Sequence, residues 1–155
     1  MTKNKFLSFL FFGAITYSAS IIGGLATYYS KEPWYSSLNK PIFNPPDWIF
    51  APVWTTLYFF MTISIWLIWH SPKKENKIIY LYLGHLIVNT TWSIVFFTFH
   101  SILGALIVLL LLIIFIIILI INFKKINLIS FYLMIPYLLW CFYALILNSS
   151  LFILN

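Results

Sequence analysis

The chain has 155 residues, of which 63% are hydrophobic, 21% aromatic and only 8% charged, and its formal net charge is +6. A soluble domain typically carries about a quarter charged residues, so this composition excludes a soluble enzyme, a nucleic-acid-binding domain and a disordered tail. All nine basic residues are lysines, and they lie at the ends of apolar runs. We therefore interpret the chain as a single membrane domain whose positive charge reflects its topology and indicates no nucleic-acid partner.

Five apolar runs follow one another along the chain, at residues 6–28, 48–69, 78–99, 102–123 and 127–154. A bilayer core about 30 Å thick takes roughly 20 helical residues per crossing. None of the runs has the strict alternation of a barrel strand. The runs predict an all-α integral membrane fold, a bundle of five transmembrane helices. Pro136 in the last run removes a backbone donor and is expected to kink or strain that helix.

The lysines predict the orientation of these helices in the membrane. Seven of them would share the side of the N-terminus, whereas Lys31 and Lys40 lie on the other side, where acidic residues offset them. The positive-inside rule then places the N-terminus in the cytoplasm and the C-terminus outside, and we expect a bacterial cell membrane. Lys3 and Lys5 could instead begin a cleaved signal peptide, but apolar character continues to Ala26 and favours an uncleaved helix.

The connection between the first two runs, residues 29–47, has an unusual composition. Five of the seven prolines lie between Pro33 and Pro52, among several aromatic residues. Trp and Tyr favour the membrane interface, so an aromatic belt would explain the aromatics. It would not explain the prolines, which lower the entropy cost of holding a loop in one shape. A stiff lid over a helix mouth explains both, and at this point lid and belt remain alternatives.

The third run carries polar residues on one face. His85, Asn89 and Trp92 follow i, i+4, i+7 spacing, and Phe96 continues the stripe. Intramembrane polar groups normally face the interior of a bundle. Asn89 could therefore bond a neighbouring helix and hold the bundle together, or it could orient a ligand in a cavity.

Two further stripes suggest close packing or a notch. Trp140, Ala144 and Asn148 recur every four residues in the last run, and a small Ala beside a large aromatic leaves space; such stripes more often serve packing than binding. Small residues four apart in the first run permit close helix approach, either within the chain or in a dimer: Ala19 with Gly23, and Ser20 with Gly24.

Conventional catalytic sets are absent from the sequence. The only acidic residues, Glu32, Asp47 and Glu75, lie between the apolar runs, and no Gly-rich phosphate loop is present. No spacing of Cys and His residues matches a metal site, so we expect no metal.

Three ordered motifs span almost the whole chain and resemble the TspO/MBR family, which includes bacterial tryptophan-rich sensory proteins and the mitochondrial translocator protein. The motifs are Trp34-Tyr35…Lys40-Pro41…Pro45-Pro46-x-Trp48…Pro52-Val53-Trp54-x-x-Leu57-Tyr58, then Asn89-x-x-Trp92-Ser93-x-x-Phe96-Phe97, and finally Pro136-Tyr137-x-x-Trp140…Ala144…Leu147-Asn148.

The resemblance implies a five-helix bundle, often dimeric, with a pocket under the first loop. Family members bind porphyrins such as protoporphyrin IX and hydrophobic drug-like molecules. The implied partners are a porphyrin or similar small molecule, membrane lipid and a second copy of the chain; the porphyrin would be a ligand, and no covalently held cofactor is implied. Carried over by position, the ligand-binding residues would be Tyr35, Pro45, Pro46, Trp54, Asn89, Trp92, Phe96, Trp140, Ala144 and Leu147.

The resemblance leaves three functions open. The first is a membrane receptor or sensor that binds porphyrins. The second is a light- and oxygen-dependent porphyrin-degrading enzyme, in which Trp54 and Trp140 would be the catalytic residues. The third is a transporter of porphyrin or lipid, although a five-helix chain lacks the inverted repeats common in transporters.

Four positions depart from the family pattern. His85 stands where members often have Gln, which could change the polarity of the pocket. Asp47 and Ala51 stand where Gly is frequent, which could alter the entry into the second long helix. Phe43 replaces a Trp found in some members.

Overall fold

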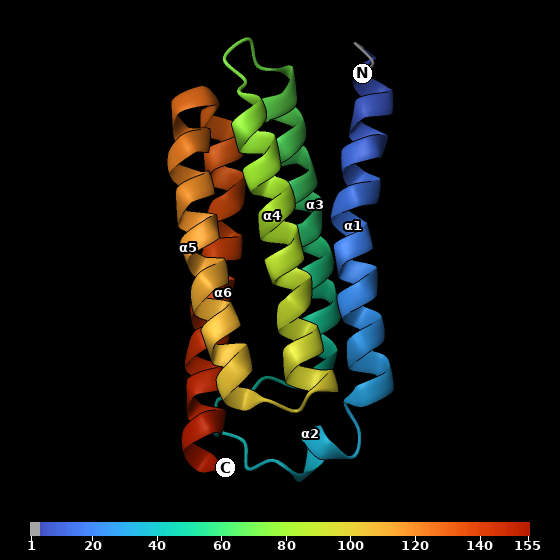
Figure 1. Ribbon diagram of the computed structural model, residues 1–155, viewed down its shortest axis with the longest axis vertical. Coiled ribbons are helices and arrows are strands. Elements are labelled where there is room, and N and C mark those ends of the chain that lie inside the picture. Colours follow the sequence, from blue (N-terminus) through green and yellow to red (C-terminus); the bar gives the residue numbers. More distant parts are fainter. Residues whose placement is uncertain (1–3) are drawn as a thin grey trace.

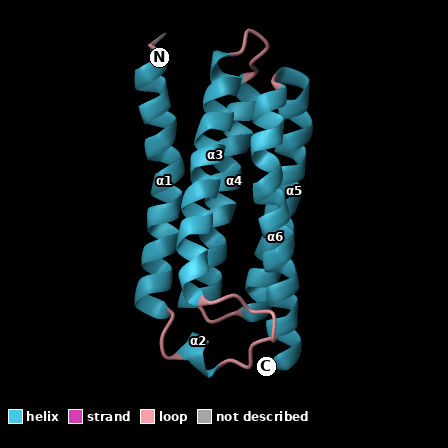
Figure 2. Ribbon diagram, turned by 180° about the vertical axis from the view of Figure 1, so that it is seen from behind, coloured by secondary structure: helices cyan, strands magenta, loops and turns pink. Residues whose placement is uncertain are grey.

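The computed structural model describes residues 4–155, so Lys3, which we counted in the orientation, lies outside the described residues. This part of the chain is helical apart from short connections and contains no strand (Figures 1 and 2). The elements in chain order are α1 (Lys5–Ser30), the one-turn helix α2 (Trp34–Ser37), the 3₁₀ turn η1 (Asp47–Ile49), α3 (Phe50–His70), α4 (Asn76–Ser93), the π-helical turn η2 (Ile94–Thr98), α5 (Ile102–Ile126) and α6 (Leu128–Leu154).

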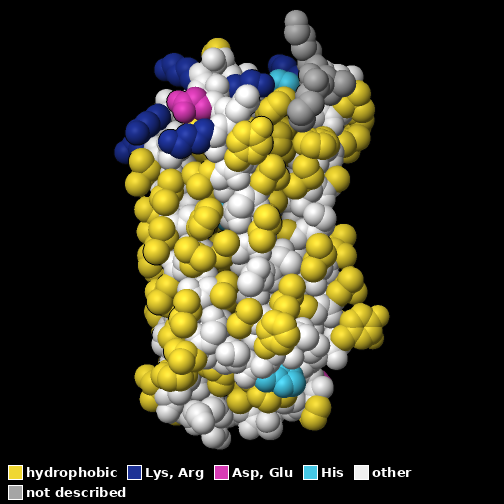
Figure 3. Space-filling model, in the orientation of Figure 1, with side chains coloured by type: hydrophobic (Ala, Val, Ile, Leu, Met, Phe, Trp, Pro, Cys, Tyr) yellow, Lys and Arg dark blue, Asp and Glu magenta, His cyan; other side chains and the backbone are white. Residues whose placement is uncertain are grey.

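Five helical segments of the described chain are long and apolar enough to cross a membrane. They are Lys5–Ser30, Asp47–His70, Asn76–Thr98, Ile102–Ile126 and Leu128–Leu154. The prediction of an integral membrane bundle of five helices is therefore confirmed. Hydrophobic side chains cover the long face of the bundle seen in Figure 3, and lysines gather at the end where α1 begins. This distribution suits a surface that meets lipid along its length and charged headgroups at that end.

Side-chain caps define where several helices begin. The Asn4 side chain accepts hydrogen bonds from the backbone N–H groups of Phe6 and Leu7 at the start of α1. Ser101 and Asn127 cap α5 and α6 in the same way. Pro136 does not end α6, which continues without a break to Leu154.

Short polar contacts join the long helices. The Ser64 hydroxyl donates to the Ser130 carbonyl and the Ser130 hydroxyl donates to the Ser64 carbonyl, both at 2.9 Å, which ties α3 to α6. The hydroxyls of Thr16 and Tyr82 are 2.7 Å apart and tie α1 to α4. Lipid tails are as apolar as leucine, so helices in a membrane associate through such hydrogen bonds and close packing.

The two small-residue pairs of α1 have different surroundings. Ala19 and Gly23 are buried. A Cβ added at Gly23 would lie 3.1 Å from the Ser93 Oγ of α4, whereas one added at Gly24 would have nothing within 4 Å. Ala19 and Gly23 therefore serve the packing of α1 against α4 within the chain.

The two ends of the bundle differ. At the end where α1 begins, Lys74 Nζ lies 3.6 Å from the centroid of the Trp69 ring, and Trp69 packs beside Phe12. At the opposite end the connection between α1 and α3, with α2 inside it, runs across the helix ends near the C-terminus of α6 (Figures 1 and 2). This connection bounds the site described below.

The surroundings of Gly23 and Gly24 predict opposite responses to a large side chain. Leucine at either position gains about 1 kcal/mol of helix propensity. At Gly23 it also overpacks the contact with Ser93, which typically costs about 1–3 kcal/mol. We expect Gly23→Leu to unfold at a lower temperature than Gly24→Leu, measured by circular dichroism in detergent; equal midpoints would contradict the packing role.

Candidate ligand-binding site

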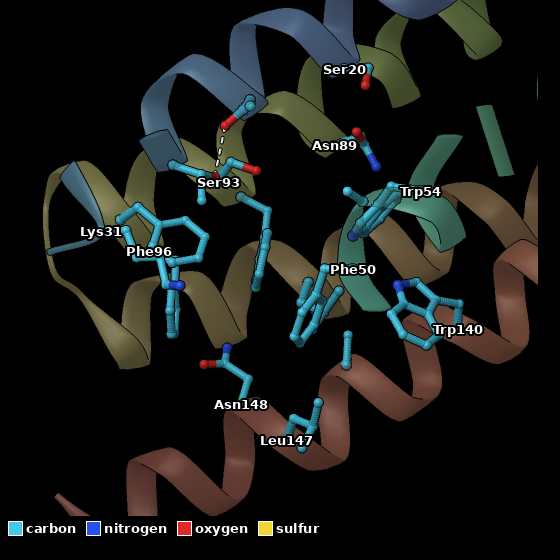
Figure 4. A pocket seen from close by; sticks show the side chains of 18 of the residues that line it. Ser20, Lys31, Phe50, Trp54, Asn89, Ser93, Phe96, Trp140, Leu147 and Asn148 are labelled. Carbon is cyan, nitrogen blue, oxygen red and sulfur yellow. Dashed lines mark hydrogen bonds between the residues drawn. The ribbon is translucent and has the colours of Figure 1, made fainter. Parts of the chain in front are cut away.

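A cavity of about 680 Å³ lies inside the bundle at the end covered by the α1–α3 connection. Its wall includes residues from all five long helices and from the connection itself. Small-molecule sites typically have volumes of roughly 300–1,000 Å³ and mostly apolar linings with a few polar groups. Figure 4 shows aromatic side chains and two asparagines arranged around this space.

Eight of the ten residues expected to bind a ligand line the cavity. They are Tyr35, Trp54, Asn89, Trp92, Phe96, Trp140, Ala144 and Leu147. Pro45 and Pro46 do not line it; they stand between Asn44 and Asp47, which do. The fold therefore brings motif residues from four separate segments of the sequence to the wall of one cavity.

Aromatic rings form much of the wall. The Trp54 ring of α3 lies 5.6 Å from that of Tyr58 and 6.2 Å from that of Tyr137, centroid to centroid. The Trp140 ring of α6 lies 6.0 Å from that of Phe50, and both point into the same space as Trp54 (Figure 4). Indole faces of this kind suit a flat, apolar molecule.

Asn89 connects three helices at the wall of the cavity. Its Oδ1 accepts a hydrogen bond from the Tyr58 hydroxyl of α3, and its Nδ2 donates to the Tyr137 hydroxyl of α6 at 2.9 Å. A carboxamide has two N–H donors and two acceptor lone pairs, so these bonds use half of its capacity. Both earlier interpretations of Asn89, holding the bundle and facing a ligand, are compatible with this arrangement.

Charged residues of the connection stand at the mouth of the cavity. Lys31 is paired with Asp47, and its Nζ lies 3.7 Å from a Glu32 oxygen. Burial lowers the pKa of the Lys31 ammonium, but the hydrogen bond that it donates to Asp47 and the charges of both carboxylates outweigh this effect and leave that pKa raised. Burial raises the pKa of the Tyr35 phenol as well. Lys31 thus keeps its positive charge, which the carboxylates of Asp47 and Glu32 balance.

The connection is fastened to the bundle at three places. The Trp34 ring stacks on His100 with centroids 4.5 Å apart. The Tyr143 hydroxyl of α6 donates to the Phe43 carbonyl at 2.8 Å. Asn39 N donates to the Asn155 side chain at 2.9 Å, and Asn155 Nδ2 donates back to the Asn39 carbonyl at 3.1 Å. These contacts hold the segment across the cavity end.

Asp47 and His85, two of the positions that depart from the family pattern, lie in different parts of the structure. Asp47 begins η1 and pairs with Lys31. His85 is fully buried but does not line the cavity; its Nδ1 donates to the Tyr82 carbonyl at 2.8 Å, and its ring lies 5.6 Å from that of Tyr137. His85 therefore belongs to the packed interior one turn away from Asn89.

Several lining residues were not expected from the sequence. Ser20 and Gly24 of α1 face the cavity, as do Leu109 and Leu112 of α5. The four-residue spacing of Ser20 and Gly24 indicated a helix face of small side chains. Such a face permits close helix packing, but it also leaves room for a cavity. The leucines carried no such signal in a run that is almost pure Ile and Leu.

These features define a helical membrane protein with an internal, ligand-sized cavity beneath an ordered connection. The model of the TspO/MBR family matches residues 11–154, and the chain belongs to this family.

Relatives that match over most of their length support the assignment. The chain is 33% identical to the tryptophan-rich protein TspO of Archaeoglobus fulgidus over 137 residues, which cover 86% of this chain and 87% of the relative. It is 31% identical to protein CrtK of Rhodobacter capsulatus over 153 residues, covering 96% and 95%. It is 34% identical to the translocator protein of Ovis aries over 133 residues, covering 81% and 79%.

The hydrogen bonds of Asn89 predict a structural effect that needs no ligand. Asn89→Leu removes the amide from two buried hydroxyls, and an unsatisfied buried group costs about 1–3 kcal/mol. We expect a clearly lower unfolding temperature for the ligand-free protein. Thr91→Val is the control, because the Thr91 hydroxyl bonds only within its own helix, to the Ile87 carbonyl; a variant at Asn89 as stable as this control would contradict the bridging role.

Proposed function

We propose that the protein is a membrane receptor or sensor that binds porphyrins of the protoporphyrin IX type, and similar flat hydrophobic molecules, in the cavity beneath the α1–α3 connection. The observation that carries this proposal is that Trp54, Asn89, Trp140 and Ala144 line one space of about 680 Å³. The connection acts as its lid. Membership of the TspO/MBR family supports the proposal.

The chemistry of the wall fits a disc with an apolar body and polar edge groups. Indole faces on α3 and α6 offer stacking surfaces for the ring. The propionate groups of a porphyrin would point toward the mouth, because a charged group deep in the bundle would lack a counter-charge. At the mouth Lys31 is already paired, whereas Lys40 lies 4.4 Å from the centroid of the Tyr35 ring and forms no ion pair among residues 4–155. Lys40 is thus the better placed partner for a propionate.

Binding of protoporphyrin IX is expected to depend on the cavity tryptophans. Titration of the purified protein in detergent, in the dark, should quench Trp fluorescence saturably. Trp140→Phe should weaken affinity about two- to tenfold, the range of an aromatic contact. Trp69→Phe is the matched control, because Trp69 lies at the other end of the bundle and should leave affinity unchanged. Absence of saturable binding would refute the proposal.

One observation favours light-dependent degradation as a second candidate function: both Trp54 and Trp140 line the same cavity. Illumination of the same complex in air distinguishes it from binding alone. A new pigment that Trp54→Phe abolishes, while dark binding survives, would establish an enzyme. Bleaching no faster than in protein-free detergent would leave a receptor.

We infer that the end of the bundle rich in lysines faces the cytoplasm. Lys5, Lys73, Lys74, Lys77, Lys124 and Lys125 flank the helices on that side. In a Cys141→Ser background, Ser37→Cys in the connection should react with a membrane-impermeant maleimide on intact bacterial cells. Asn76→Cys, at the lysine-rich end, should react only after the cells are permeabilised; the reverse pattern would invert the topology. Both positions are exposed.

A further inference from the structure

The two asparagines that line the cavity differ in their hydrogen bonds. Asn89 is held at both ends of its amide by tyrosine hydroxyls. Asn148 is 2% exposed, and neither its Nδ2 nor its Oδ1 has a partner within residues 4–155. The Nε1 of Trp92, another lining residue, is unpaired in the same part of the chain. Buried polar groups in proteins are nearly always paired, so this set requires an explanation.

Asn148 is placed to meet a ligand. It lies on α6 four residues beyond Ala144, and Figure 4 shows its side chain pointing from α6 into the cavity. Its neighbours Leu147 and Leu151 are apolar and also line the space. Asn148 lies six residues before the end of α6, or about 9 Å of axial rise. Asn148 is therefore an unpaired polar group between apolar neighbours on the α6 side of the wall.

The charges around the cavity restrict what Asn148 could bind. Among the described lining residues Lys31 is the only lysine, and Asp47 and Glu32 neutralise it. An ionised ligand group beside Asn148 would lack a counter-charge in a low-dielectric interior, which is strongly unfavourable. A carboxamide side chain offers both N–H donors and acceptor lone pairs, and the Trp92 indole adds a donor. The complementary group is therefore uncharged and both donates and accepts.

We propose that Asn148, with Trp92 as a second donor, forms a hydrogen-bonding subsite for a carboxamide or a protonated carboxylic acid of the ligand. The Asn148 Oδ1 accepts from the ligand's N–H or O–H, its Nδ2 donates to the ligand's carbonyl, and Trp92 Nε1 donates to the remaining lone pair. Asn89, in contrast, holds neighbouring helices in place and is not part of this subsite. This assignment rests on the proposed function and names the ligand chemistry that the cavity selects.

Two uncharged probes of similar size test the subsite: the bis-carboxamide and the dimethyl ester of protoporphyrin IX. Both have carbonyl acceptors, but only the amide can donate to Asn148. One additional hydrogen bond corresponds to about a tenfold difference, so the wild-type protein should bind the amide about tenfold more tightly than the ester. Asn148→Leu, which keeps a similar volume, should bind both probes equally.

Two further variants sharpen the test. Thr55→Val also changes a lining residue, but the Thr55 hydroxyl already donates to the Ala51 carbonyl, so this control should keep the preference for the amide. Trp92→Phe keeps an aromatic face and removes the N–H, so it should weaken both probes by a similar factor.

The possible failures are distinguishable. If the wild-type protein binds both probes equally and Asn148→Leu changes neither, the subsite is wrong while ligand binding in the cavity stands. If neither probe binds saturably, the proposed function fails and the subsite with it. The unfolding temperature of ligand-free Asn148→Leu should be no lower than that of the wild type, because the substitution removes an unpaired buried amide. A loss of stability as large as that of Asn89→Leu would make Asn148 structural and overturn the proposal.

Discussion

The structure depends on the hydrogen bonds of one carboxamide, that of Asn89. It joins α3, α4 and α6 through Tyr58 and Tyr137, and these three helices provide the tryptophans and the alanine notch of the cavity. In a membrane interior, hydrogen bonds are strengthened by the low dielectric and unpaired polar groups are costly. Rotation of any of the three helices would leave at least one of these groups unpaired. The amide therefore fixes the rotation of the helices and, with it, the direction in which Trp54 and Trp140 point.

Other contacts complete the bundle around Asn89. The reciprocal serine bonds hold α3 against α6 below the cavity, and the close approach at Gly23 brings α1 against α4. The α1–α3 connection, rather than a further helix, covers the end of the bundle opposite the N-terminus. The space between the helix ends is therefore left as a cavity. The contacts of the connection to His100, Tyr143 and Asn155 replace the packing that a longer helix would have provided.

Much of this organisation was predictable from the sequence, because length and hydropathy alone define a membrane span. The cavity aromatics were predictable because the family motifs name them. The distinction between Asn89 and Asn148 was not predictable: each lies on a stripe that also carries a tryptophan, and what separates them is whether tyrosine hydroxyls of facing helices pair with the amide. His85 shows the same limit, since the spacing placed it on a face with Asn89, but its ring packs between Tyr82 and Tyr137. The short helix α2 was missed because four residues after a proline carry no periodicity.

The positions of the indoles along α3 have a spectroscopic consequence. Trp54 lines the cavity and Trp69 lies beside Lys74 at the opposite end, fifteen residues further along the same helix, or roughly 22 Å of axial rise. These two indoles thus emit from opposite ends of the bundle. Energy transfer from each to a coloured guest falls steeply with separation. The residual emission at saturation therefore measures how deeply a guest lies in the bundle, without any attached dye.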